Sequence, residues 1–288
     1  MVRREIDLAD ELRLDLAGSR IGVRAWREQR EQREHHRLAH AATLACALLA
    51  TGLAACQHDV ASTDGAFYDW SGRRLHCAVD IDDSTRNDFA SIETGLDRAR
   101  DRGEVLELYA HHPGVTLSWD TIDKVFAAAQ ERGLPFITYG DLARGTAPSG
   151  GLLFSFDDSW VDAWTSGREI FQRYGARVTF FIAYYPKFTD AMKAELQQLA
   201  ADGHDIEAHS ITHSRAPEYV ESKGLAAYID EDVVPSIDLL RRDGYDVTAF
   251  AYPFGSRTEQ TDRAIFEHVD LIRSVAFTWS GVESPCPF

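Results

Sequence analysis

The stretch Phe154-Ser155-Phe156-Asp157-Asp158 ends an apolar run on two adjacent carboxylates. Ionised carboxylates this close repel each other, so a nearby cation is needed to stabilise them. A pair of histidines, His209 and His213, follows later in the chain. One aspartate and two histidines form a suitable ligand set for a catalytic zinc, which leaves the second aspartate free to act as a base. The stretch therefore predicts a metal-assisted hydrolase.

Apolar runs that suit strands alternate with helical patterns on both sides of this stretch. The expected strands are residues 75–79, 105–109, 135–139, 151–156, 178–182, 205–208, 247–251 and 271–277, and the expected helices are 87–102, 118–132, 161–174, 190–201, 225–242 and 261–268. This alternation predicts a parallel sheet, either open or closed into a barrel. Asp157, His209, Pro253 and His111 each follow an expected strand, and ligands bind at the carboxyl ends of such strands.

Three motifs in this order resemble those of the polysaccharide deacetylases of carbohydrate esterase family 4, the NodB-like homology domain. They are Ser155-Phe156-Asp157-Asp158, His209-Ser210-Ile211-Thr212-His213 and Phe250-Ala251-Tyr252-Pro253-Phe254-Gly255. The resemblance covers about residues 150–275. It implies an α/β fold, a distorted and incomplete (β/α) barrel with parallel strands.

The resemblance also implies a role for each motif. Asp157 would be the general base that activates water. A divalent metal, expected to be Zn²⁺, would be held by Asp158, His209 and His213. The turn formed by Tyr252, Pro253 and Phe254 would meet the substrate, and the amide near Phe254 would help to stabilise the oxyanion.

Two features of the motifs leave alternatives open. Many relatives carry an arginine where this chain has Ala251, and either Arg257 or Arg273 is a candidate to replace it. Trp160 and Trp164 follow the first motif and serve either as core residues or as surfaces that stack against sugar rings.

The family usually carries two further motifs after the third, and here they are sought at the other end of the chain. Ala78-Val79-Asp80-Ile81-Asp82-Asp83-Ser84 resembles the fourth motif, and residues 103–112 resemble the fifth. We therefore expect a circularly permuted domain over residues 66–288. Residues 66–148 would supply the usual C-terminal elements, and residues 149–288 the usual N-terminal ones.

By the same resemblance, a histidine of the fifth motif is the catalytic acid. Alternation along a strand lets only one of His111 and His112 face the site. We favour His111, because His112 precedes Pro113 and is expected to begin a turn. Either Asp80 or Asp82 would support the acid, and we favour Asp80.

The first 56 residues predict export rather than a folded domain. A charged leader is followed by residues 38–55, which are apolar and free of Asp, Glu, Lys and Arg. They end in Leu53-Ala54-Ala55-Cys56, which resembles the bacterial lipoprotein processing box and implies a lipid anchor on Cys56. An uncleaved membrane helix or a buried alanine-rich helix is the alternative. Residues 57–65 would form a tether, and Cys77 and Cys286, which flank the permutation point, are expected to form a disulfide.

The formal net charge of −16 argues against nucleic acid as a partner and favours a neutral or cationic substrate. We expect a monomeric, exported, membrane-anchored enzyme that faces the periplasm or the cell exterior and deacetylates an N- or O-acetylated polysaccharide. A carbohydrate-binding protein that has lost turnover, or a metal amidase that acts on small amides, are the alternatives.

Overall fold

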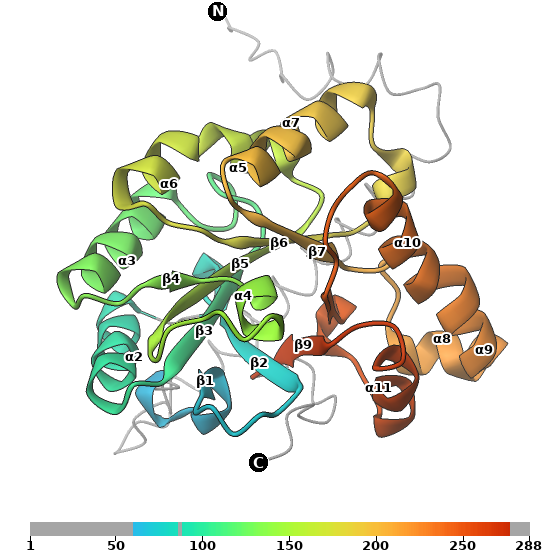
Figure 1. Ribbon diagram of the computed structural model, residues 1–288, viewed down its shortest axis with the longest axis horizontal. Helices are drawn as coiled ribbons and strands as arrows, with labels where there is room; N and C mark the ends of the chain where they lie inside the picture. Colours follow the sequence, from blue (N-terminus) through green and yellow to red (C-terminus); the bar gives the residue numbers. More distant parts are fainter. Residues whose placement is uncertain (1–59, 86–87, 277–288) are drawn as a thin grey trace, which may run out of the picture. The chain divides into compact units, whose positions relative to one another are not determined.

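The structure is a computed structural model that describes residues 60–85 and 88–276 of the 288-residue chain (Figure 1). The predicted leader, processing box and Cys56 lie outside the described residues, as does the first part of the tether. Cys77 is disulfide-bonded, and its predicted partner, Cys286, also lies outside the described residues. Among the described helices, none has the length and apolar character needed to cross a membrane.

A closed barrel of seven parallel strands forms the centre of the fold. Each strand pairs with the next, and the pairing of β3 with β5 closes the ring. The expected α/β barrel is therefore confirmed, with one strand fewer than the eight of a complete (β/α) barrel. In order around the ring the strands are β5 (Gly151–Asp158), β6 (Thr179–Ile182), β7 (Asp205–Ala208), β8 (Ala249–Ala251), β9 (Leu271–Val275), β2 (Leu75–Asp80) and β3 (Val105–Ala110).

The two strands from the N-terminal part of the chain fill the gap between the last strand and β5. β2 pairs in parallel with β9, and β3 pairs in parallel with both β2 and β5. A circularly permuted barrel requires these pairings of β2 and β3 with β9 and β5. The permutation itself stays a prediction. Two short strands lie outside the ring: β1 (Phe67–Tyr68) is antiparallel to β3, and β4 (Phe136–Ile137) is parallel to β5.

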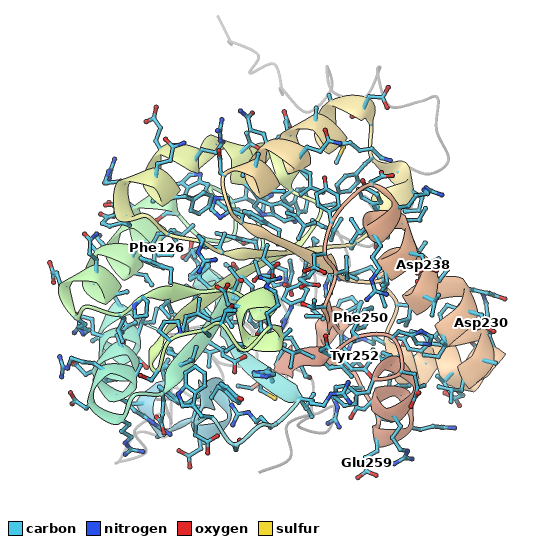
Figure 2. The ribbon with its side chains drawn as sticks, in the orientation of Figure 1. Phe126, Asp230, Asp238, Phe250, Tyr252 and Glu259 are labelled. Atoms are coloured by element: carbon cyan, nitrogen blue, oxygen red, sulfur yellow. The ribbon has the colours of Figure 1, made fainter. Side chains whose placement is uncertain are left out.

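Helices connect the strands and cover the outside of the barrel (Figure 1). Figure 2 shows Phe126 of α3 on the side that faces the strands, whereas Asp230, Asp238 and Glu259 lie on the outer side. The helices are α2 (Phe89–Arg102), α3 (Trp119–Glu131), α4 (Tyr139–Ala143), α5 (Val161–Ser166), α6 (Arg168–Tyr174), α7 (Asp190–Ala201), α8 (Ala216–Lys223), α9 (Leu225–Tyr228), α10 (Val234–Arg242) and α11 (Glu259–Ile265).

The structure refines several expected boundaries. The expected helix 161–174 is divided at Gly167, where a Cβ atom would lie 1.8 Å from the ring of Trp119. The expected helix 225–242 contains a π-helical turn, Ile229–Val233, between α9 and α10. The expected strand 135–139 is shorter, because the side chain of Thr138 caps α4. Helix α8 was not expected from the sequence.

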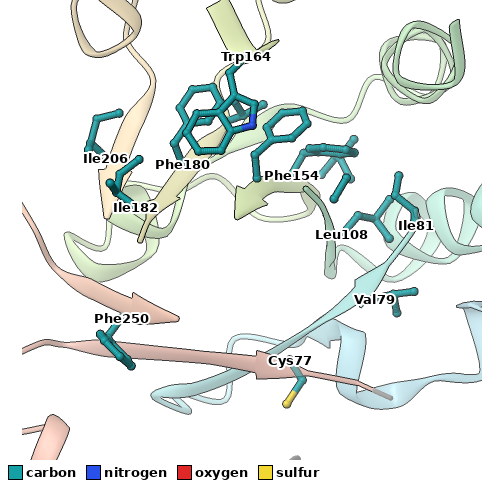
Figure 3. Packing of buried hydrophobic residues seen from close by; sticks show 14 of the residues in the cluster. Cys77, Val79, Ile81, Leu108, Phe154, Trp164, Phe180, Ile182, Ile206 and Phe250 are labelled. Carbon is teal, nitrogen blue, oxygen red and sulfur yellow. The ribbon is translucent and has the colours of Figure 1, made fainter. Parts of the chain in front are cut away.

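Strand alternation divides the core into two layers. Phe154, Phe156 and Phe180 point outward and pack with Trp164 against the helices. Figure 3 labels Phe154, Phe180 and Trp164 in this cluster. Their neighbours in sequence point into the barrel, and they include Ser155, Asp157 and Phe181. The apolar residues of β5 therefore anchor the strand while its alternate residues bring polar groups to the barrel axis.

Candidate active site

Within residues 60–85 and 88–276, two groups of side chains lie close enough to hold a metal ion. The first is the predicted set, Asp158, His209 and His213, whose ligand atoms all lie within 4.8 Å of one another. Asp158 Oδ1 lies 3.0 Å from His213 Nε2 and 3.9 Å from His209 Nε2. The structure therefore brings together the three predicted ligands at the carboxyl ends of β5 and β7.

His209 is held in the orientation that a metal ligand needs. Its Nδ1 lies 2.8 Å from the carbonyl oxygen of Ala251. Because a carbonyl only accepts, Nδ1 carries the proton and Nε2 keeps its lone pair. Burial lowers the pKa of His209 to about 4, so the ring is neutral near pH 7. A neutral imidazole with a free Nε2 is the form that binds zinc.

The carboxylates next to His209 also fit a cation. Burial alone would raise the pKa of Asp158, but His213, His111 and His209 together lower it, so the group is ionised. Asp157 Oδ1 is buried and has no hydrogen-bond partner among the described residues, and Asp158 Oδ1 is buried beside His213 Nε2. Buried acceptors are seldom left unpaired, and two imidazole nitrogens with one carboxylate oxygen suit Zn²⁺.

Strained backbone surrounds this group. Asp158, Ser210, His213 and Phe254 have φ values of 86°, 68°, 54° and 59°, in the left-handed region that non-glycine residues seldom adopt. Each such residue costs roughly 1–3 kcal/mol and persists only where neighbouring contacts hold it. The strain is concentrated where the two histidines and the acid converge, which is typical of functional sites.

Asp232 holds the histidine loop, and sequence reasoning missed it. Its buried carboxylate accepts hydrogen bonds from the amides of Ile211 and Thr212, at 3.0 Å and 2.7 Å. Ser210 Oγ accepts another from the amide of His213, at 2.8 Å. In the sequence, Asp232 is one of three consecutive acids on an expected helix, and nothing distinguishes it from its exposed neighbours.

Arg273 supplies the guanidinium for which the third motif has no residue. Its Nη2 donates a hydrogen bond to Asp157 Oδ2, and both side chains are buried. Arg273 of β9 is directly paired with Ala251 of β8, so it stands one strand away from the expected position. The other candidate, Arg257, instead donates to Asp262 at 2.8 and 2.9 Å.

His111 lies near this site with a carboxylate behind it. Its Nδ1 donates to Asp82 Oδ2 at 2.6 Å, and Thr116 Oγ1 donates to Asp82 Oδ1 at 2.9 Å. The expectation that Asp80 supports the acid is corrected. Asp80 ends β2, whereas Asp82 lies in the following turn and reaches the end of β3. Asp80 Oδ1 instead accepts from the amide of Asp82.

Asp80, Asp82 and His111 form the second group that could hold a metal. This group suits proton transfer better, because His111 Nδ1 is already bonded to Asp82. Burial alone would lower the pKa of His111, but the charge of Asp82 raises it well above the usual value. Because of this raised pKa, His111 is a protonated imidazolium near pH 7. Burial raises the pKa of the neighbouring Asp80 to about 7, and the charge of Asp82 adds to that shift.

The two tryptophans after the first motif position residues of the site. Trp164 is fully buried, and its Nε1 donates to the carbonyl oxygen of His111 at 3.0 Å. Its role as a core residue is confirmed. Trp160 stacks on His112 with the ring centroids 4.1 Å apart, and its Nε1 lies 3.4 Å from Asp158 Oδ2. His112 is thus engaged by Trp160, and His111 as the acid stays a prediction.

The end of the third motif forms the 3-10 turn Pro253–Gly255. Tyr252 is fully buried, and its hydroxyl lies 2.9 Å from both Thr261 Oγ1 and Asp262 Oδ1 of α11 (Figure 2). Its expected contact with substrate is corrected, because strand alternation turns this side chain into the outer layer. Phe254 is 38% exposed, and its ring lies 4.7 Å from that of His213.

One family model and one curated relative match parts of the chain. Residues 144–268 match the family model described as polysaccharide deacetylase. Over 117 residues the chain is 30% identical to a gellan lyase from a Bacillus species. That alignment covers 38% of this chain and 4% of the lyase, so the chain spans only a small part of this curated relative.

Several solved structures are similar to parts of this chain. One is the Streptococcus pyogenes deacetylase PplD in complex with acetate, with 17% identity, 57% of this chain and 78% of that chain covered, and a TM-score of 0.47. IcaB from Ammonifex degensii has 16% identity, coverage of 60% and 87%, and a TM-score of 0.48. A de-N-acetylase from Aggregatibacter actinomycetemcomitans has 14% identity, coverage of 63% and 97%, and a TM-score of 0.48.

Replacing a predicted ligand should weaken zinc binding. We expect Asp158→Asn and His213→Gln each to lower the affinity for Zn²⁺ at least about tenfold, because each replaces one of three zinc ligands with a neutral amide, which binds zinc poorly. Equilibrium dialysis with metal analysis measures the affinity. Asp82→Asn is the control, and its affinity for Zn²⁺ should equal that of the wild-type protein. Loss of zinc in Asp82→Asn, with normal binding in Asp158→Asn, would move the metal to the second group.

Proposed function

We propose that this chain, whose residues 144–268 match the family model of polysaccharide deacetylases, is a metal-dependent hydrolase that removes acetyl groups from a polysaccharide. One observation carries the proposal. Asp157, fixed by Arg273, lies beside the three-residue set Asp158, His209 and His213, close to an imidazole that is bonded to its own carboxylate. This arrangement provides a base, a metal site and an acid within one barrel end.

A divalent cation held by Asp158, His209 and His213 would lower the pKa of a bound water and polarise the acetyl carbonyl. Asp157 acts as the base that takes the proton of the attacking water, and its free Oδ1 is the acceptor. Arg273 holds the other oxygen, Oδ2, and so fixes the direction in which Oδ1 points. Arg273 is a positioning residue, since it acts through Asp157.

His111 acts as the acid that protonates the leaving nitrogen or oxygen. Its Nδ1 is bonded to Asp82, so Nε2 is the atom that gives the proton. Asp82 keeps the ring protonated and oriented, in the way that a carboxylate supports a catalytic histidine elsewhere. Trp164 fixes the backbone of His111 through its indole N–H.

The turn after β8 offers a donor for the oxyanion. Its two hydrogen bonds are donated by Gly255 and Ser256, to the carbonyl oxygens of Tyr252 and Pro253. The amide of Phe254 takes no part in them, and the ring of Phe254 packs against that of His213. We assign this amide to the developing negative charge of the carbonyl oxygen.

The alternative of a binding protein without turnover rested on the absence of an arginine at Ala251. Arg273 supplies a guanidinium to Asp157 from the neighbouring strand, which removes the reason for that alternative. No contact of the described residues favours a small amide over an acetylated sugar.

The proposal includes export of the protein. The apolar segment 38–55 and the following Cys56 support a lipid anchor and a position in the periplasm or at the cell exterior. The disulfide at Cys77 suits an oxidising compartment. We further propose that the protein acts as a monomer on an envelope or environmental polysaccharide, and that residues 66–148 supply the permuted C-terminal elements of the family.

Acetate release from acetylated xylan and from chitin oligosaccharides tests the proposed reaction. We expect Asp157→Asn to lower the rate about 10²- to 10⁴-fold, because the amide cannot accept the proton of water. Zinc content is measured in parallel and should stay unchanged. A variant that keeps zinc and releases acetate at the original rate would refute Asp157 as the base.

The role of Arg273 is tested by comparing two arginines that the sequence alone did not distinguish. We expect Arg273→Met to lower kcat by about 100-fold, since a misplaced base costs that much. Arg257→Met breaks its pair with Asp262 and should leave kcat near the original value. Circular dichroism confirms folding of both variants. Equal losses of kcat in both would make Arg273 a structural residue only.

The pH dependence of kcat/KM reports on His111. The charge of Asp82 raises the pKa of His111, so the acid form is present at neutral pH and is lost as the pH rises through that raised pKa. We expect Asp82→Asn to shift the alkaline limb of the profile to lower pH. An alkaline limb that does not move would separate Asp82 from the acid.

A further inference from the structure

Two aromatic rings lie beside the ring of His213, and each has a cation over it. The ring of Phe254 lies 4.7 Å from that of His213, and the guanidinium of Arg215 lies 4.2 Å from the Phe254 centroid. The ring of Tyr184 lies 5.8 Å from that of His213, and Lys187 Nζ lies 4.1 Å from the Tyr184 centroid. We call Tyr184, Lys187, Arg215 and Phe254 the cationic rim.

The rim belongs to the same end of the barrel as the metal ligands. Tyr184 and Lys187 follow β6, and Arg215 follows β7 and directly precedes α8. Parallel strands bring their carboxyl ends to one edge, so these loops meet beside Asp158. The left-handed φ of 56° at Tyr184 and the strain at His213 and Phe254 show that the chain holds these rings in place despite a local cost.

Acidic partners neutralise these two cations only weakly. Arg215 Nε lies 3.7 Å from Glu218 Oε1, and the side chain of Glu218 is 75% exposed. Within the described part of the chain, no carboxylate lies within 4.0 Å of Lys187. Exposed pairs such as Arg215–Glu218 contribute little, so both cations remain available to a ligand.

The rim is a local exception in an acidic protein. The formal net charge is −16, and it favoured a neutral or cationic substrate. Net charge acts at long range, however, and at physiological ionic strength charges are screened beyond about 8 Å. Contacts within that distance are set by the side chains at the site, and over the rings of Tyr184 and Phe254 these are the cations of Lys187 and Arg215.

Building on the proposed function, we propose that the cationic rim binds a carboxylate on a sugar next to the acetylated one. The substrate is then an acetylated acidic polysaccharide that contains uronic acid. Arg215 has the planar donor fork that matches a carboxylate, and Lys187 adds a second positive charge. Tyr184 and Phe254 offer apolar faces against which sugar rings pack.

Two forms of one oligosaccharide test the inference by calorimetry on the full chain. The first is a hyaluronan hexasaccharide, which alternates acetylated amino sugars with uronic acids. The second is the same hexasaccharide with its carboxylates reduced to alcohols. Binding is measured on the Asp157→Asn variant, so that turnover does not interfere. We expect the carboxylate form to bind about fivefold more tightly, which is the size that exposed charge contacts give.

The double variant Arg215→Gln/Lys187→Gln should abolish this preference and leave the affinity for the reduced form unchanged. The control, Lys124→Gln/Arg263→Gln, removes the same charge from two exposed side chains on α3 and α11 and should keep the preference. Equal affinity for the two forms in the starting protein overturns the inference. So does a preference that survives loss of Arg215 and Lys187.

Acetate release separates this inference from the proposed reaction. Tighter binding of the carboxylate form, without release of acetate from any acetylated polymer, would support the role of the cationic rim and refute the proposed reaction. Equal release of acetate from neutral and acidic polymers, with equal binding of the two hexasaccharides, would support the proposed reaction and refute the role of the cationic rim.

Discussion

The site depends on how two adjacent carboxylates at the end of β5 are each stabilised. A closed barrel brings the strand ends together, and there Asp157 is buried and Asp158 is only partly exposed, so water alone does not separate their charges. The structure gives each a different positive neighbour. Asp157 is hydrogen-bonded to Arg273, which is a fixed and fully buried cation. Asp158 lies beside His209 and His213, and these three side chains could hold an exchangeable metal cation. This division underlies the proposed roles of Asp157 as the base and Asp158 as a metal ligand.

Closure of the barrel also assembles the site. The proposed base and metal ligands come from β5 and β7, the guanidinium comes from β9, and the proposed acid follows β3. β2 and β3 occupy the gap between β9 and β5, so His111 and Asp82 meet the other groups only when the N-terminal strands are in place. The strain at Asp158 and His213 is tolerated because packing on both sides of the strands fixes their positions.

The sequence predicts the barrel and the ligands but not their supports. Local patterns are strong where strands are apolar and where motif spacing is short, as at Asp157, Asp158, His209 and His213. Arg273, Asp82 and Asp232 act across strands or turns that are distant in sequence, and no local pattern reveals such contacts. The predicted contact of Tyr252 with substrate is wrong. The motif locates the backbone of Tyr252, but the alternation of side chains along β8 directs its side chain toward α11.

The central claim is that the cation belongs to Asp158, His209 and His213, and that His111 and Asp82 are left to move protons. Anomalous diffraction at the zinc edge, from crystals of the zinc-loaded full chain, tests it most directly. The account predicts one strong peak within coordination distance, about 2.0–2.2 Å, of His209 Nε2, a nitrogen of His213 and an oxygen of Asp158. A peak among Asp80, Asp82 and His111 instead would contradict it.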